Sequence, residues 1–119
     1  NEMRMAALQG KSTAADAAAT SAWDVLAMAT INGARALGKE DCLGTLETGK
    51  LADCVAIDLA YLNSQPVYDP ISTLVYSVQA QQVSHVWVDG KLNVENGQLT
   101  MLDPAEIMAT AKKSAQKIA

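Results

Sequence analysis

The chain has 119 residues, half of them hydrophobic, which is enough for one core and gives no reason to expect two independent domains. Thirteen acidic residues outnumber nine basic ones, and no cluster of Lys or Arg stands out, which argues against a nucleic-acid-binding protein. No apolar run reaches the roughly 18 residues of a membrane span, and residues 1–8 lack the layout of a secretory signal. We therefore expect a soluble cytoplasmic protein without nucleic-acid or membrane partners.

The first part of the chain has the pattern of short helices. Residues 2–9 suit a helix, and Gly10 is well placed to end it, because glycine readily adopts the left-handed conformation of a C-cap. Residues 14–19 are rich in alanine but have little to bury. We expect them to form either a helical turn or an ordered loop.

A further helix is predicted after this alanine-rich segment. Thr20 or Ser21 is expected to be its N-cap, and Asp24 lies in its first turn, where the helix dipole favours an acid. The helix has an apolar stripe at the spacing i, i+3, i+4, formed by Val25, Leu26, Met28 and Ala29.

The pattern changes from helix to strand between residues 31 and 57. Residues 31–33 interrupt the preceding helix, and residues 34–37 predict a short helix that ends at Gly38. Residues 54–57 are a short apolar segment typical of a strand. We expect this strand to be covered on both faces.

The two cysteines, Cys42 and Cys54, lack the spacing of a CxxC motif. A chain of this size and apolar content does not need disulfide bonds for its stability. We therefore expect two free structural thiols, in preference to a bridge or a pair of metal ligands.

Two further helices are predicted to begin at an Asp-Pro pair. Asp69 caps and Pro70 begins a short helix over residues 71–78, and Asp103-Pro104 begins the final helix in the same way. We expect the apolar stripe of the final helix to pack on a sheet or a barrel. This stripe and the lysines opposite it are Ile107, Met108, Ala111, Ala115 and Ile118, and Lys112, Lys113 and Lys117.

Between these two helices the chain predicts consecutive antiparallel strands. Residues 83–88 and 91–95 are separated by Asp89-Gly90, the strongest two-residue signal of a β-hairpin. Asn96-Gly97 repeats this signal, and residues 98–100 follow it. The sequence therefore predicts a three-stranded meander within an α+β order of elements, with too few strands for a closed sheet.

The residues do not compose a recognisable catalytic or metal-binding set. A hydrolytic zinc site needs about three protein ligands, whereas the chain has one histidine, His85, which we interpret as a structural or surface residue. Ser84 is expected to point to the opposite face of the strand, which argues against a pair of nucleophile and base. Glu40-Asp41 and Lys112-Lys113 are interpreted as solvated surface. We predict no catalytic, cofactor-binding or metal-binding residue in this chain.

Three stretches together resemble the C-terminal end of the amidohydrolase superfamily. Residues 29–38, Ala-Thr-Ile-Asn-Gly-Ala-Arg-Ala-Leu-Gly, are similar to the helix that leaves the family's barrel. Residues 43–53 resemble its return into a β-sandwich. Residues 65–76, together with the Val-Trp-Val-Asp-Gly ending of residues 86–90, resemble most the branch that deaminates methylthioadenosine and adenosylhomocysteine, which is also similar to chlorohydrolases.

This resemblance implies a fold and a type of reaction. The family has a (β/α)₈ barrel plus a β-sandwich built from both chain ends, and its active site lies at the C-terminal face of the barrel strands. A divalent metal, zinc or iron, activates water there. The implied ligands are an early His-x-His pair, two later histidines and an aspartate, with a glutamate that transfers protons. All of them would precede Asn1, because residues 1–4 are similar to the helix that follows the metal-binding aspartate.

The resemblance therefore predicts an α+β fragment of such a metal-dependent hydrolase. Residues 1–38 would be the terminal barrel helices, residues 39–102 the C-terminal part of the composite β-sandwich, and residues 103–119 a C-terminal helix. The implied parent deaminates an adenine nucleoside, with guanine and triazine-like rings as alternatives. We expect the chain to be catalytically incomplete without the N-terminal barrel portion of its parent, and the parent to be a homo-oligomer.

Two other hypotheses are consistent with these residues. One is a non-catalytic binding or interaction module, and the other is a subunit of a split hydrolase whose barrel is a separate polypeptide. A start codon directly before Asn1 would favour the module, and co-purification of a larger polypeptide would favour the split enzyme. As an isolated fragment, the chain is expected to expose faces that the rest of the barrel and sandwich would cover, and therefore to self-associate or aggregate.

Overall fold

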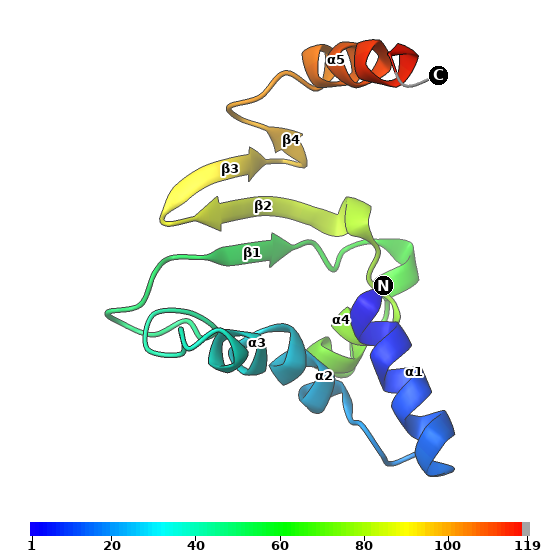
Figure 1. The fold of residues 1–119 in the computed structure, drawn as a ribbon. Helices are drawn as coiled ribbons and strands as arrows, with labels where there is room; N and C mark the ends of the chain where they lie inside the picture. The colour runs from blue at the N-terminus through cyan, green and yellow to red at the C-terminus, as the bar shows by residue number, and fades with distance from the viewer. Residues whose placement is uncertain (118–119) are drawn as a thin grey trace.

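The computed structural model describes residues 1–117 and has the predicted α+β architecture. Its α-helices and 3₁₀ turns are α1 (Glu2–Ala14), α2 (Ala22–Ala29), α3 (Ile31–Ala36), η1 (Leu62–Ser64), α4 (Pro70–Tyr76), η2 (Ala80–Gln82) and α5 (Pro104–Gln116). Its strands are β1 (Cys54–Ile57), β2 (Val83–Val88), β3 (Lys91–Glu95) and β4 (Gln98–Leu99). Figure 1 shows α1 to α4 beyond the β1 edge of the sheet and α5 beyond the β4 edge. None of the helices within residues 1–117 is long and apolar enough to cross a membrane.

The helical unit, which consists of α1, α2, α3 and α4, has a small core. Ala7 of α1, Val25 of α2 and Val75 of α4 are at most 3% exposed and contact one another. Ser21 begins α2 with a capping box, in which its hydroxyl accepts from the Asp24 amide at 3.2 Å and Asp24 Oδ2 accepts from the Ser21 amide at 2.7 Å. The predicted N-cap is therefore confirmed at Ser21.

Gly10 does not end the first helix, so this prediction is wrong. Helix α1 continues to Ala14 and ends where Ala15 adopts a left-handed conformation with a φ of 50°. A Cβ atom at Gly10 would lie 2.1 Å from Thr20 Oγ1. Glycine is therefore required here because the segment before α2 passes close to α1, and not because the helix ends.

The segment after α1 is an ordered loop, which decides between the two predicted alternatives. Lys11 Nζ donates to the carbonyl of Ala17 at 2.8 Å and to that of Ala19 at 2.7 Å. The amide of Ala18 donates to Asp16 Oδ1 at 2.8 Å. These contacts satisfy two carbonyls and one amide of the loop that no helical hydrogen bond reaches.

The apolar stripe predicted for α2 is only partly buried. Val25 is 1% exposed but Met28 is 52% exposed, because the helices that pack on α2 cover only part of its circumference. The break between α2 and α3 lies at Thr30, and residues 31–33 are helical, contrary to the prediction. Gly38, with a φ of 62°, follows α3 as predicted.

The four strands form one antiparallel sheet in the order β1-β2-β3-β4. Both predicted hairpin turns have positive φ at each central residue, 50° and 72° at Asp89-Gly90 and 50° and 76° at Asn96-Gly97. This conformation matches the right-handed twist of the flanking strands. The predicted meander is confirmed, and β1 extends it to four strands.

The first strand is not covered on both faces, contrary to expectation. Val55 of β1 is 54% exposed, and Val88 of β2 and Leu99 of β4 are 47% and 42% exposed. The described residues form a single sheet, so they supply no second sheet to pack on this face.

Both predicted Asp-Pro caps are present. Asp69 precedes Pro70, and its carboxylate accepts from the amides of Ile71 and Ser72 at 3.2 and 3.1 Å. Asp103 Oδ1 accepts from the amide of Ala105 at 2.8 Å at the start of α5. The short helix α4 ends at Tyr76, two residues earlier than predicted.

Within residues 1–117 the final helix does not pack on the sheet or on the helical unit, and its packing on a barrel stays a prediction. Every residue of α5 is exposed, including Ile107 at 46% and Met108 at 58%. Ile118, which was predicted to continue the stripe, lies outside the described residues. The apolar face of α5 therefore has no cover within residues 1–117.

The chain exposes much more surface than a compact protein of its mass. Its accessible surface is 8703 Å² and its radius of gyration is 17.5 Å. A compact monomer of 12.5 kDa exposes about 6,200 Å², and a compact chain of this length has a radius of gyration of about 13.5 Å. The excess of about 2,500 Å² is larger than the roughly 800 Å² that each partner contributes to a standard interface.

We predict that Gly10→Ala destabilises the helical unit by about 1–3 kcal/mol, since overpacking at a close contact costs about that much. Gly33→Ala is the matched control, because its Cβ would lie 3.6 Å from the nearest atom, the carbonyl oxygen of Met28 in α2, which is an ordinary contact. The control is expected to be neutral or stabilising. Thermal unfolding followed by circular dichroism measures both. Equal stability of the two variants would contradict this account of Gly10.

Candidate functional site

Metal-ligating side chains do not gather in the part of the chain that the structure describes. Across residues 1–117, no group of three or more His, Cys, Asp or Glu side chains is placed to hold a metal ion. Both cysteines are free thiols, as predicted. The charge pairs Glu40-Asp41 and Lys112-Lys113 are exposed, as predicted. That this chain contributes no site residue stays a prediction.

Ser84 and His85 lie closer together than the sequence predicted. Ser84 Oγ is 3.0 Å from His85 Nδ1, although neighbours in a regular strand point to opposite faces. A β-bulge is the cause. Ala56 of β1 pairs with His85 and Ile57 pairs with Val83, which leaves Ser84 as an extra residue in β2.

This pair nevertheless does not have the hydrogen bonding of a nucleophile and its base. Ser84 Oγ donates to the carbonyl of Ala56 at 3.1 Å, and a hydroxyl has only one proton to donate. That proton is therefore not available for a hydrogen bond to His85 Nδ1. The His85 ring also stacks on Trp87, with centroids 5.5 Å apart and an interplanar angle of 11°. These contacts support a structural role for His85.

Gln82 is the centre of a buried polar cluster, which we name the Gln82 cluster. The side chain is 1% exposed, and its amide makes four hydrogen bonds. Nε2 donates to the Asp58 carbonyl at 2.9 Å and to Ser64 Oγ at 2.7 Å. Oε1 accepts from Asn63 Nδ2 at 2.8 Å and from the Gln79 amide at 3.0 Å. The cluster therefore joins the end of β1 to η1 and η2.

Gln82 was not among the residues predicted from the sequence. A glutamine in an irregular segment is usually exposed, so no pattern distinguished it from the exposed Gln81 beside it. Its importance comes from the contacts of its side chain with residues 18 to 24 positions away. Such contacts exist only after the chain has folded.

A small groove lies beside the Gln82 cluster. Its volume is about 200 Å³, and its lining residues are Asp58, Tyr61, Gln81, Gln82, Val83, Ser84, Asn96 and Gly97. Pockets that enclose small molecules have volumes of about 300–1,000 Å³. Asp58, the one acidic residue in the lining, accepts from the Ala60 amide at 2.8 Å. This groove is too small to enclose a nucleoside.

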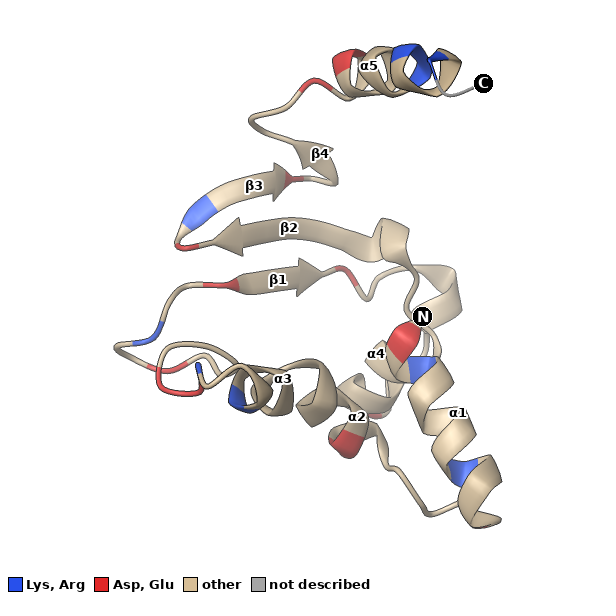
Figure 2. Ribbon diagram, viewed as in Figure 1, with Lys and Arg blue, Asp and Glu red and all other residues tan. Residues whose placement is uncertain are grey.

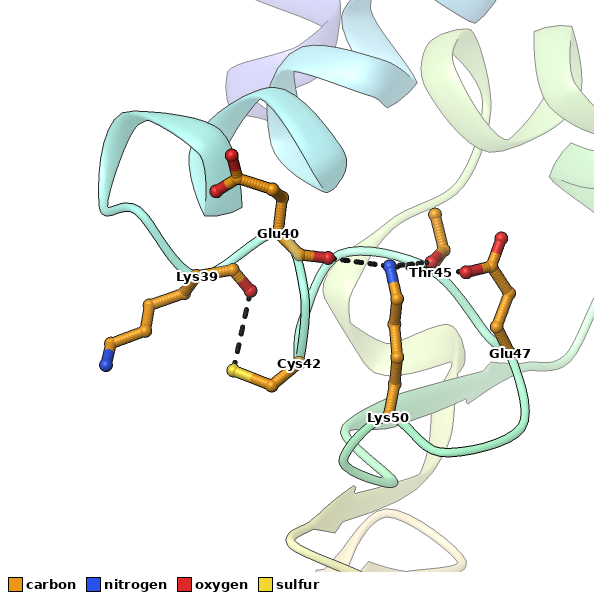
Figure 3. A network of polar contacts seen from close by, with 6 residues as sticks. All are labelled: Lys39, Glu40, Cys42, Thr45, Glu47 and Lys50. Atoms are coloured by element: carbon orange, nitrogen blue, oxygen red, sulfur yellow. Dashed lines mark hydrogen bonds and ion pairs between the residues drawn. The ribbon is translucent and has the colours of Figure 1, made fainter.

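Lys50 organises the loop between α3 and β1 (Figure 3). Its Nζ donates to the Glu40 carbonyl and to Thr45 Oγ1, both at 2.7 Å, and lies 3.3 Å from Glu47 Oε2. The ammonium of Lys50, and next the Thr45 hydroxyl, lower the pKa of Glu47. All three partners come from the same loop, so Lys50 is a structural residue and its charge is compensated.

The Asp69 cap is a further strongly hydrogen-bonded carboxylate in the helical unit. The hydroxyl of Ser72, which donates to Asp69 Oδ2 at 2.5 Å, is the main cause that lowers the pKa of Asp69. The backbone amides of Ser72 and Ile71 lower this pKa further. The ionised form of Asp69 is therefore the form that stabilises α4.

Comparison with known proteins connects this fold to a group of hydrolases. The sequence profile of the amidohydrolase family matches residues 1–93. A 5-methylthioadenosine/S-adenosylhomocysteine deaminase of Teredinibacter turnerae is 50% identical over 117 residues, which cover 98% of this chain and 26% of the relative. The enzyme of the same name from Moorella thermoacetica is 40% identical over 116 residues, which cover 98% of this chain and 27% of that relative.

Solved structures share the arrangement of these elements. An adenosine deaminase from Xanthomonas campestris with bound zinc superposes with a TM-score of 0.95 at 40% identity, covering 98% of this chain and 27% of its own. An atrazine chlorohydrolase from Arthrobacter aurescens complexed with zinc superposes with a TM-score of 0.86 at 32% identity, covering 94% of this chain and 25% of its own. The chain thus spans about a quarter of the length of the proteins that it matches.

We predict that Gln82→Met destabilises the chain by at least about 2 kcal/mol, because it leaves buried donors and acceptors without partners. The matched control is Gln81→Met at the neighbouring exposed position, which is expected to stay within about 0.5 kcal/mol. Chemical unfolding of both variants measures the difference. Equal midpoints would show that the Gln82 cluster does not hold the fold together.

The lowered pKa of Asp69 predicts a dependence of stability on pH. The pKa of the Asp69 carboxyl group is lower in the folded chain than in the unfolded chain. Such a group stabilises the folded state at pH values above its unfolded pKa, and this stabilisation is lost as the pH falls through the folded pKa. Asp69→Asn keeps a good N-cap but does not titrate. The melting temperature of the variant should therefore fall less between pH 7 and pH 3 than that of the unmodified chain. An identical fall in both proteins would contradict this.

Proposed function

This chain belongs to the amidohydrolase family, and we propose that it is the C-terminal region of a hydrolase that deaminates the adenine ring of 5-methylthioadenosine or S-adenosylhomocysteine. The observation that carries the proposal is the 50% identity to a deaminase of that name over 117 residues. The match includes the helical unit, the sheet and α5, so it does not depend on one short motif. The reaction replaces the exocyclic amine of adenine by oxygen from water and releases ammonia.

The role proposed for the chain is to complete the fold of this deaminase. The chain exposes about 2,500 Å² more than a compact protein of its mass, which is the surface that a large internal interface would cover. Residues 1–38 are proposed as barrel helices, residues 39–102 as sandwich strands with their connections, and residues 103–119 as a terminal helix. In this role the caps and hairpins of the chain hold its shape, and its side chains do not touch the reacting atoms.

The metal implied by the family does not fit the residues described here. The zinc-bound relatives point to a divalent metal, but residues 1–117 contain no suitable group of ligands. We therefore propose that the ligands belong to the part of the deaminase that this chain does not span. The contribution of this chain to the chemistry is indirect.

The percentages of sequence identity favour an adenine nucleoside over a triazine as the substrate of the whole protein. The chain is 50% identical to a methylthioadenosine/adenosylhomocysteine deaminase and 40% identical to an adenosine deaminase. It is 32% identical to the atrazine chlorohydrolase. The uncovered surface of about 2,500 Å² is also larger than the roughly 800 Å² that one partner contributes to a standard interface, which favours the deaminase fragment over a free-standing interaction module.

A chimera tests the proposal. In the Teredinibacter turnerae deaminase, the matched quarter would be replaced by this chain, and ammonia release from 5-methylthioadenosine and S-adenosylhomocysteine would be measured. We expect the chimera to retain the activity of the relative to within about tenfold, which corresponds to about 1.4 kcal/mol of transition-state stabilisation. The isolated chain is expected to release no ammonia.

The controls are the unmodified relative and the metal content of each protein. A folded chimera that binds zinc as the relative does and yet lacks deaminase activity would overturn the proposal. Deamination by the isolated chain would contradict its proposed incompleteness.

A further inference from the structure

Helix α5 stands apart from the elements that precede it (Figure 1). Residues 100–103, which connect it to β4, are exposed, and none of the residues of α5 is buried. A shallow groove runs along one side of the helix, lined by Leu102, Asp103, Glu106, Ile107, Thr110 and Ala111. The most apolar side of α5 is therefore open within the described chain.

An uncovered helix of this length has little reason to be stable. It has 13 residues, and isolated helices shorter than about 12–15 residues are marginal in water even when they are rich in alanine. Its Asp103 cap contributes only at the first turn. Packing of an amphipathic face is what stabilises most helices in proteins. A stable α5 therefore needs a surface that covers Ile107, Met108 and Ala111.

Comparison with the solved relative shows that the position of α5 is not arbitrary. The superposition on the zinc-bound adenosine deaminase covers 98% of this chain with a TM-score of 0.95. The TM-score, counted over this chain, cannot exceed the fraction of its residues that superpose. Because α5 contains 13 of the 119 residues, a superposition without this helix would have a TM-score of at most 106/119, about 0.89. Helix α5 thus has the same position in the relative, although its own chain does not hold it there.

The charges on α5 indicate the chemistry of the surface that would cover it. Figure 2 shows an acidic residue near the start of the helix and basic residues in its second half. These are Glu106, and Lys112 and Lys113; Lys117 follows directly after the last residue of the helix. At 100° per residue, Lys112 borders the apolar stripe and Lys113 lies opposite it. A matching surface is apolar, with carboxylates beside its edge at the C-terminal half of the helix.

We propose that α5 is a docking helix whose stripe of Ile107, Met108 and Ala111 packs on the part of the deaminase outside the matched quarter, at an apolar patch with acidic neighbours. This inference rests on the proposed function. The matched relative has 73% of its length outside the superposed region, and that length supplies the occupant. The alternative occupant is a second copy of this chain.

Hydrogen exchange of the α5 amides in the chimera tests the docking. We expect these amides to exchange at least about tenfold more slowly in the chimera than in the dilute isolated chain, because docking adds tertiary protection. Ile107→Glu in the chimera should remove this protection. Glutamate is a better helix former than isoleucine, so the loss would report lost docking and not a weaker helix.

The matched control is Ala109→Glu, which adds the same charge about 150° away from the centre of the stripe. Protection should persist in this variant. Equal exchange of α5 in the chimera and the isolated chain, or equal effects of the two substitutions, would overturn the docking proposal. Protection that appears in the isolated chain as its concentration rises would identify a second copy as the occupant and would also overturn it.

The two proposals fail in different ways. A chimera that deaminates its substrates but leaves α5 unprotected refutes the docking helix and keeps the function. A chimera with a protected α5 and no deaminase activity refutes the function, while the docking surface stands.

Discussion

The amide of Gln82 holds together parts of the chain that share few other contacts. Its four hydrogen bonds connect the end of β1 with η1 and η2, the segments that lead into and out of α4. Three small side chains, Ala7, Val25 and Val75, form the apolar core of the helical unit. With so little apolar packing, the orientation of the sheet relative to the helices depends on buried polar contacts, which are stronger in a low dielectric when every partner is satisfied.

The chemistry of local segments explains which features the sequence could predict. The caps at Ser21, Asp69 and Asp103, and the turns at Asp89-Gly90 and Asn96-Gly97, each depend on residues within three positions of one another. Propensity and capping rules describe such interactions directly. The free cysteines and the α+β order followed from composition and pattern in the same way.

The features that the sequence could not predict arise where distant segments meet. Gly10 is required by Thr20, which approaches it only when the loop folds back on α1. Ser84 turns toward His85 because β1 and β2 pair with a bulge. Helix α4, from the middle of the segment predicted as sandwich, packs against α1 and α2. The function could be inferred only from the resemblance of long segments to deaminases, and the comparisons support this resemblance. The lack of a recognisable set of metal ligands was less informative about function.

The two tight turns of the meander also affect the order in which the chain can fold. Strands β2, β3 and β4 are joined by two-residue turns, so their contacts close very short loops. The helical core instead brings Val75 to Val25 and Ala7, across more than 40 intervening residues. Loop closure costs more entropy as the loop lengthens, and local contacts form faster than distant ones. The meander is therefore the natural nucleus during refolding, and the helical unit assembles when α4 returns to α1 and α2.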